Sequence, residues 1–235
     1  MFVPFFGGKK EQLRRHLEFI AELGYVSAVI ENHPPRSPVH PKRMIARDGR
    51  WGIKHVWADD IEEFLHELRG PKIIFAFSGP SSCAIEALAR SPGNLLEVKG
   101  LICDSGPFLY DRYCNRNRLY IERGIKNPVL LAAVASIHKM IWSRNHEQTL
   151  RDTLSRLPQH FPVLSIRPLS DVLVPPWTVD AAFRDQKHLS LEILDVPGAG
   201  HLKGLRDHPE IYKPAVQRFI EKISRPLEPR VDATL

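Results

Sequence analysis

The chain has little cysteine and no long apolar run. Only three of its 235 residues are cysteines, at positions 83, 103 and 114. This small, odd number without metal-ligand spacing argues against a disulfide framework and indicates a reducing compartment. The longest apolar stretch, Pro128–Trp142, is interrupted by Ser136, His138 and Lys139. No stretch therefore approaches the roughly 20 apolar residues of a membrane span.

The amino-terminal segment is apolar only from Met1 to Phe6, because Lys9 and Lys10 follow. It is too short for the apolar part of a secretion signal, and no basic segment precedes it. We therefore expect a cytoplasmic protein without a signal peptide. Repeats and low-complexity tracts are also lacking, and the length and 43% apolar content fit one α/β domain with a real core.

Positive charge is in excess, with a formal net charge of +6. Most of the charges are dispersed, which is typical of a solvated surface. One local cluster comprises Arg112, Arg116, Arg118, Arg123 and Lys126. No recognition motif or aromatic platform for nucleic acid accompanies it in the sequence. We therefore expect no nucleic-acid partner, and at most a weak peripheral contact with a membrane.

Apolar runs and helical patterns alternate along the chain. The expected strands are 2–6, 25–30, 72–77, 98–104, 161–166 and 191–196. The expected helices are 11–23, 57–68, 81–89, 177–183 and a last one with Tyr212, Val216, Phe219 and Ile223 on one face. This alternation predicts a parallel sheet with helices on both faces, an α/β three-layer sandwich.

Residues 108–160 interrupt the alternation with helical stretches and no clear strand. Asn127 followed by Pro128 is typical of a helix start, and an aliphatic run follows it. We expect a helical cap over the carboxyl edge of the sheet, whose apolar side chains wall a pocket or simply pack as core. The predicted organisation is a single domain over 1–225 and a flexible tail over 226–235.

The segment 72–89 reads K-I-I-F-A-F-S-G-P-S-S-C-A-I-E-A-L-A, an apolar strand that enters small residues and then a helix. This is the layout of a nucleophile elbow, in which a sharp turn lifts a serine hydroxyl above the sheet. Ser78 ends the strand, and Gly79 is free to take the strained turn. The spacing Gly79-x-Ser81 instead favours Ser81, which could also be only a helix cap. The pattern alone leaves the two serines open.

Two further residues follow predicted strands. Asp171 lies in the loop after 161–166, where it is either a catalytic acid or a turn aspartate. His201 lies in a glycine-rich loop after 191–196. The order Ser, Asp, His is that of the α/β hydrolases. Since parallel strands bring their carboxyl ends to one edge, we expect these side chains to form one site.

Three segments carry a family resemblance: F-S-G-P-S at 77–81, I-C-D-S-G-P at 102–107 and G-H-L-K-G-L-R-D-H-P at 200–209. They are similar to F-S-N-G-G, I-F-D-S-A-P and A-H-V-S-H-L-R-D-Y-P in the α/β hydrolases, particularly in a short hydrolase-like family. That family includes a eukaryotic nuclear-envelope transmembrane protein. The resemblance covers nearly the whole chain, from Phe2 to about Ile223. It implies about six parallel strands, lacking the first two of the usual eight.

The resemblance also implies Ser78 as the nucleophile, completed by Asp171 and His201. The N–H of Gly79, with that of Phe5 or Phe6, would bind the oxyanion. The implied activity is hydrolysis of a small ester or thioester through an acyl-enzyme, with no cofactor. The chain departs from the family at Pro4, Pro80 and Gly204, which stand where the relatives have glycine, glycine and histidine. An inactive, partner-binding member of the same fold is the alternative.

Overall fold

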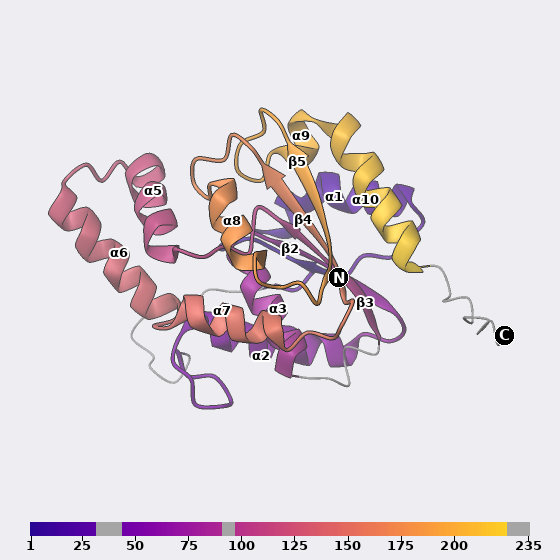
Figure 1. Cartoon of the computed structure of the whole chain (residues 1–235), viewed down its shortest axis with the longest axis horizontal. Coiled ribbons are helices and arrows are strands. Elements are labelled where there is room, and N and C mark those ends of the chain that lie inside the picture. The colour runs from indigo at the N-terminus through magenta and orange to yellow at the C-terminus, as the bar shows by residue number, and fades with distance from the viewer. Residues whose placement is uncertain (32–43, 91–96, 225–235) are drawn as a thin grey trace.

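The computed structural model describes residues 1–31, 44–90 and 97–224, and its centre is a five-stranded parallel sheet (Figure 1). The spatial order is the chain order, β1-β2-β3-β4-β5. The strands are β1 (Phe2–Val3), β2 (Lys72–Phe77), β3 (Val98–Asp104), β4 (Pro162–Pro168) and β5 (Ser190–Val196). The α/β class and the parallel sheet with helices are therefore as the sequence predicts.

The central strands β2 and β3 are almost continuously apolar because both of their faces are covered. Their register pairs Phe77 with Asp104, the last residue of each strand. The residues that follow, Ser78 and Ser105, therefore leave the sheet side by side at its carboxyl edge. The expected ranges of these two strands are those observed.

Helices cover both faces of the sheet (Figure 1). The side chains of α1 (Arg14–Glu22) and α10 (Pro209–Ser224) pack on one face, with a short α9 (Gly204–Asp207) and a 3-10 turn η1 (Lys10–Leu13) beside them. The other face is covered by α2 (Ile53–Glu67), α3 (Ser81–Arg90), α7 (His146–Ser155) and α8 (Pro176–Phe183). Burial of these amphipathic faces supplies the main stabilisation of the fold.

The expected strands at 2–6 and 25–30 are much shorter in the structure. Strand β1 ends at Val3, since Pro4 has no N–H to continue the ladder and the chain turns at Phe6. A strand of two residues offers little to pair with. The segment 25–30 accordingly forms only a bridge from Val29 to Phe2, and we count five strands rather than six.

Three helices lie between β3 and β4. The first two, α5 (Asp111–Arg123) and α6 (Pro128–Trp142), form a hairpin at one end of the molecule (Figure 1), whereas α7 packs against α3 in the body. The predicted start of α6 is confirmed, because the Asn127 side chain accepts hydrogen bonds from the N–H groups of Val129 and Leu130. Across the described ranges, no helix is long and apolar enough to cross a membrane. The expected tail, 226–235, lies outside the described residues.

Candidate active site

Ser78 occupies the sharp turn between β2 and α3, and it has a φ of 54°. The left-handed region is costly for a residue with a side chain, so the surrounding structure must impose it. We expected Gly79 to take the strained conformation. Gly79 has no positive φ, however, and the strained residue is Ser78 itself. A strained serine directly before a helix amino terminus is the geometry of a nucleophile elbow.

The neighbouring chain enforces this turn. The Ser78 N–H donates to the carbonyl of Asp104 at 2.8 Å. Gly106 passes so close that an added Cβ would lie 2.8 Å from the carbonyl carbon of Ser78 and 3.1 Å from its Cα. Only glycine fits at this approach, because both neighbouring atoms are backbone. The segment 104–106 therefore holds the elbow from the side.

Ser81, the alternative nucleophile, is fully buried in the first turn of α3. Its Oγ donates a hydrogen bond of 2.7 Å to the carbonyl oxygen of Ser78. The hydroxyl therefore closes the turn from inside, whereas Ser78 is only half-buried.

Asp171 and His201 are brought together from the loops after β4 and β5. His201 Nδ1 lies 2.6 Å from Asp171 Oδ2. The other carboxylate oxygen, Oδ1, accepts the N–H groups of Leu173 and Val174 at 2.9 and 2.8 Å. The Asp171 side chain is buried, and these two donors fix its orientation. The second oxygen is left for the imidazole, which donates to it through Nδ1–H.

Asp104 and Ser105 connect this pair with the elbow. The carbonyl of Asp104 accepts the Ser78 N–H, and Ser105 Oγ accepts the N–H of Leu202 at 3.1 Å. The backbone N–H groups of Ser78 and Leu202 thus donate hydrogen bonds to Asp104 and Ser105, which are consecutive residues at the end of β3. Nevertheless, within the described part of the chain Ser78 Oγ makes no hydrogen bond to His201 or to another residue.

The candidate oxyanion donors are free of other partners. Within residues 1–31, 44–90 and 97–224, the N–H groups of Gly79, Phe5 and Phe6 donate to no acceptor. The amino terminus of α3 adds the positive end of a helix dipole beside Gly79. Aromatic rings cover this place: an added Cβ on Gly79 would lie 3.7 Å from the Trp142 ring and 3.8 Å from the Phe108 ring.

The apolar side chains of α6 divide among three environments. Leu131 and Ala135 pack against Leu119 of α5 in a small core of the hairpin. Trp142, at the end of α6, reaches the main core and the elbow. Four others are more than half exposed: Val129, Leu130, Ile137 and Met140. Trp142 is thus the side chain of α6 that lies nearest to the elbow at Gly79.

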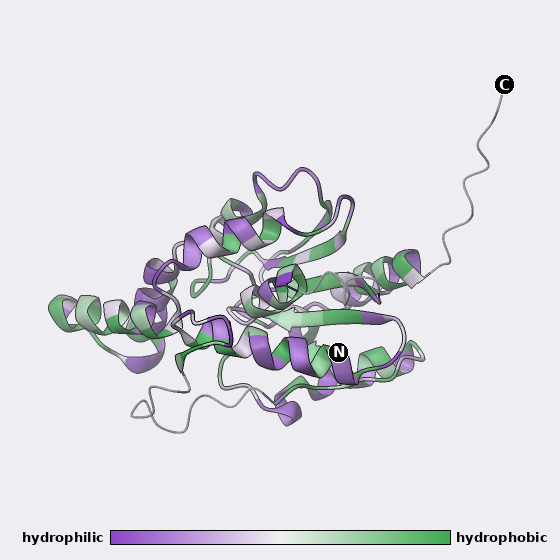
Figure 2. Ribbon diagram, turned by 90° about the horizontal axis from the view of Figure 1, so that it is seen from below, coloured by the Kyte–Doolittle hydropathy of each residue, from purple (hydrophilic) through white to green (hydrophobic). Residues whose placement is uncertain are grey.

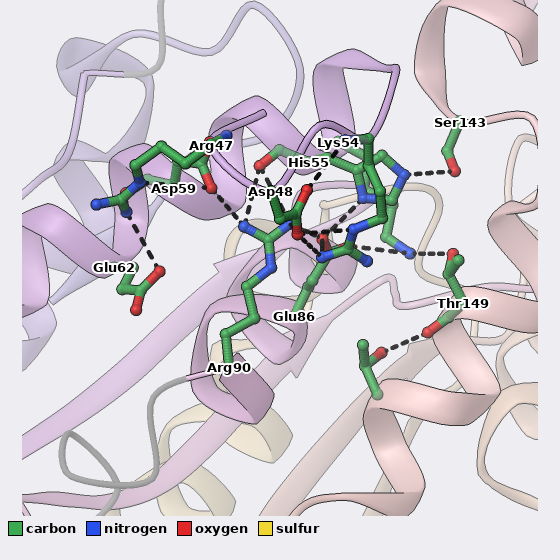
Figure 3. A network of polar contacts seen from close by, with 12 residues as sticks. Arg47, Asp48, Lys54, His55, Asp59, Glu62, Glu86, Arg90, Ser143 and Thr149 are labelled. Carbon is green, nitrogen blue, oxygen red and sulfur yellow. Dashed lines mark hydrogen bonds and ion pairs between the residues drawn. The ribbon is translucent and has the colours of Figure 1, made fainter. Parts of the chain in front are cut away.

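A buried polar network joins α2, α3 and the α6–α7 junction, and the sequence analysis missed it (Figure 3). His55 Nδ1 lies 2.7 Å from Glu86 Oε1, and His55 Nε2 lies 3.0 Å from Ser143 Oγ. Lys54 Nζ donates to Thr149 Oγ1 at 2.8 Å and lies 3.4 Å from Glu86. Burial opposes ionisation of Glu86, but the hydrogen bond from His55 and the positive charges nearby lower its pKa to about 2.

One signal for this network is present in the sequence. Glu86 stands inside the otherwise apolar stretch C-A-I-E-A-L-A of a predicted helix, where a lone carboxylate needs a partner. The partners Lys54 and His55 escaped attention because the helix was expected to begin only at Trp57, whereas α2 begins at Ile53.

Comparison with known proteins gives no match between this sequence and a protein-family model, and none with a curated protein. The three-dimensional structure, in contrast, is similar to many solved structures.

A monoacylglycerol lipase from Paleococcus ferrophilus has a TM-score of 0.62 at 16% sequence identity, covering 95% of this chain and 93% of that chain. The esterase Pf2001 from Pyrococcus furiosus has a TM-score of 0.61 at 16% identity, covering 94% of this chain and 80% of that chain. A thermophilic esterase from Thermogutta terrifontis has a TM-score of 0.58 at 20% identity, covering 95% and 89%. At these identities the likeness concerns the fold, and the chain has the fold of the α/β hydrolases.

Proposed function

We propose that this chain is a serine hydrolase that acts on a carboxylic ester or thioester. Ser78 is the nucleophile, His201 the general base and Asp171 the residue that orients it. The observation that carries the proposal is the 2.6 Å contact between Asp171 and His201 at the edge of the sheet where Ser78 takes its strained φ. The esterases and lipase of similar fold give it further support.

In the proposed reaction, His201 Nε2 takes the proton of Ser78 Oγ while the oxygen attacks the substrate carbonyl. Asp171 stabilises the imidazolium that forms. The N–H of Gly79, with that of Phe5 or Phe6, receives the developing oxyanion. His201 then gives its proton to the leaving group, and water hydrolyses the acyl-enzyme by the same sequence of proton transfers.

We assign the cap function to the α5–α6 hairpin. It follows β3 directly, and Trp142 brings its end to the elbow, whereas α7 packs against α3. A cap in this place would exclude water and restrict the acyl group. We also propose a cytoplasmic location, which the three unpaired thiols support. We further propose that the chain belongs to the short hydrolase-like family named above, whose elbow begins with the same Phe-Ser pair as Phe77 and Ser78.

An inactive, partner-binding protein is the second candidate. It is favoured by the missing hydrogen bond between Ser78 Oγ and His201, and by the rings of Phe108 and Trp142 against Gly79. In an active enzyme these features would change when substrate binds, because catalytic hydrogen bonds often tighten only in the complex.

Labelling with a fluorophosphonate probe, followed by identification of the modified residue, separates the two candidates. We expect covalent modification of Ser78 in the wild-type chain and none in Ser78→Ala. Ser81→Ala should still be labelled, because its hydroxyl only closes the turn. Labelling of Ser81 would show that Ser78 is not the nucleophile, and no labelling of a correctly folded wild-type protein would rule out the serine hydrolase.

A further inference from the structure

Two adjoining hollows lie along α5, apart from the candidate catalytic residues. One has a volume of about 400 Å³ and is lined by Tyr110, Arg112, Tyr113, Arg116 and Glu147. The other has a volume of about 370 Å³ and is lined by Tyr113, Arg116, Asn117, Tyr120, Lys126, Pro128 and Leu131. Tyr113 and Arg116 belong to both, so that a single extended ligand could occupy the two hollows. No residue of the proposed triad lines either.

Three cations of these hollows have no ion-pair partner in the part of the chain that the structure describes. The side chains of Arg112, Arg116 and Lys126 make no ion pair or hydrogen bond with the described residues. By contrast, the neighbouring Arg118 is paired with Glu122 at 2.9 Å. Glu147 is the single acidic side chain among those lining the hollows. Unpaired guanidinium groups around a hollow favour an anionic ligand, and phosphate above all, since its oxygens accept their paired N–H donors.

Exposed aromatic rings accompany the cations. The ring centroids of Tyr110 and Tyr113 lie 5.2 and 5.4 Å from that of Trp177, in the first turn of α8. These three residues are 41 to 47% exposed, and Tyr120 is 53% exposed. The sequence analysis found no aromatic platform beside this charge cluster, but the structure places Tyr110, Tyr113 and Tyr120 in the same hollows as the cations. Such rings can stack against a flat base while the guanidinium groups hold phosphates.

The hollows are coupled to the proposed active site through the acid loop. The Asn117 side chain donates a hydrogen bond of 3.0 Å to the carbonyl of Val172, the residue after Asp171. Trp177 follows the same loop. A ligand held by Arg116 therefore lies on the side of Asp171. Since no residue of the triad lines the hollows, its reacting carbonyl must be carried to Ser78 on an arm that leaves them.

We propose, on the basis of the serine-hydrolase function above, that the hollows along α5 bind the nucleotide of a coenzyme A thioester. The phosphates contact Arg112, Arg116 and Lys126, the base stacks on the tyrosine rings of the hollows, and the pantetheine arm carries the acyl group to Ser78. The thioester carbon is attacked by Ser78 Oγ, and the sulfur leaves with the proton from His201. Simple esters lack both the arm and the phosphates.

A surface of anionic lipid would also attract this charge. The ribbon of α6, at one end of the molecule, is mostly hydrophobic (Figure 2). Exposed apolar side chains are nevertheless spread over the chain: four lie on α6, Ile121 lies on α5, and others lie elsewhere, such as Val26 and Ile193. The unpaired cations come from α5 and the loop after it, whereas Lys139, the one lysine of α6, lies 4.0 Å from the buried Asp111. Cations and rings that line common hollows fit a discrete ligand better than a flat bilayer.

The test compares butyryl-coenzyme A with butyryl-N-acetylcysteamine, which has the same acyl group and thioester but no nucleotide. We expect the wild-type kcat/KM to be at least tenfold higher for the coenzyme A thioester, because its KM is lower. This ratio of the two kcat/KM values should decrease at high salt. Arg116→Gln should reduce this ratio of kcat/KM values at least tenfold. Arg123→Gln is the matched control, because Arg123 is an exposed residue of α5 that lines neither hollow, and its ratio should be that of the wild type.

Binding of coenzyme A itself, measured by calorimetry, gives a readout that is independent of turnover. We expect binding that Ser78→Ala leaves intact and Arg116→Gln weakens about tenfold. A ratio close to one together with no binding would overturn the inference, even if Ser78 is labelled by the fluorophosphonate. If Arg116→Gln abolishes binding to phosphatidylglycerol vesicles but leaves the ratio unchanged, the surface is a membrane contact and the inference is equally wrong. Binding without any labelling of Ser78 would instead refute the hydrolase and keep the nucleotide site.

Discussion

Replacing Asp171 with asparagine removes the negative charge beside His201 and keeps the size of the side chain. The asparagine carbonyl can still accept the N–H groups of Leu173 and Val174, which lie 2.9 and 2.8 Å from Oδ1 in the wild type. The loop should therefore keep its shape. The asparagine amide nitrogen would then face His201 Nδ1, which in the wild type lies 2.6 Å from a carboxylate oxygen, and would donate a hydrogen bond to it. That forces the proton of the imidazole onto Nε2, where the proton of Ser78 must be received.

The expected loss in kcat follows from this tautomer. In serine hydrolases of known mechanism the same change costs about 10,000-fold, which corresponds to about 5 kcal/mol of transition-state stabilisation. Stability should fall by only about 1 to 2 kcal/mol, because one charge-assisted hydrogen bond is replaced by a neutral one. Activity and folding are therefore expected to separate clearly.

The assay measures kcat for p-nitrophenyl butyrate, together with the free energy of unfolding in urea. Asp207→Asn is the control, because Asp207 is a carboxylate near His201 in the chain whose side-chain partner is Arg206 at the surface. If Asp171→Asn keeps kcat within threefold of the wild type while remaining folded, Asp171 is not the catalytic acid. Asp104, the buried carboxyl group at the end of β3 beside the elbow, would then be the next residue to test.

Two further substitutions test the structure around the site. Gly106→Ala should lower kcat more than tenfold and cost about 1 to 3 kcal/mol of stability, because its methyl group collides with the Ser78 backbone; enzyme assays and urea titrations measure both. Gly49→Ala, with φ of 82° and no neighbour within 4 Å, should cost about 1 to 2 kcal/mol without loss of kcat. Burial, and next the charge of Lys54, lower the pKa of His146 from 6.5 to about 3. Between about pH 6.5 and 3 the unfolded chain therefore binds a proton at His146 that the folded chain does not bind, and this residue contributes a loss of stability of about 1.4 kcal/mol per pH unit. Burial also lowers the pKa of His16 to about 3, which adds a loss of the same sign. His146→Gln should therefore reduce the slope, without abolishing it, in urea titrations at pH 7 and 4.5, and an unchanged slope would contradict the assignment.

The sequence predicted the central part of the fold well because its signals there are local. The strands Lys72–Phe77 and Val98–Asp104 are apolar runs bounded by turn residues, and both have the expected limits. The segment 25–30 has the same apolar character, but its neighbour β1 is too short to pair with it. Whether a strand forms thus depended on a partner that the segment itself does not specify.

The sequence named the residues of the candidate site, whose catalytic role stays a prediction, but it did not reveal the contacts that support them. Strand ends point to Ser78, Asp171 and His201, because in a parallel sheet such ends share an edge. The approach of Gly106 to Ser78 and the hydrogen bond from Asn117 to the acid loop join segments far apart in the chain. No spacing within either segment encodes such contacts.

The buried network offers a second serine–histidine–acid arrangement, and its hydrogen bonds are more complete than those of the candidate site. Ser143 Oγ, His55 and Glu86 are linked at 3.0 and 2.7 Å. Catalysis also requires access and a positive environment for the oxyanion, however. Ser143 and His55 are 1% and 3% exposed, and Glu86 is 0% exposed, so no substrate reaches them. Ser143 ends α6, where its N–H is bound to Lys139 and the negative end of the helix dipole opposes an oxyanion. Ser78 precedes a helix amino terminus, beside N–H groups that have no other partner among residues 1–31, 44–90 and 97–224. Access and the polarity of the two helix ends, rather than the hydrogen-bond geometry, therefore favour Ser78 as the candidate nucleophile and Ser143 as a structural residue at the end of the hairpin.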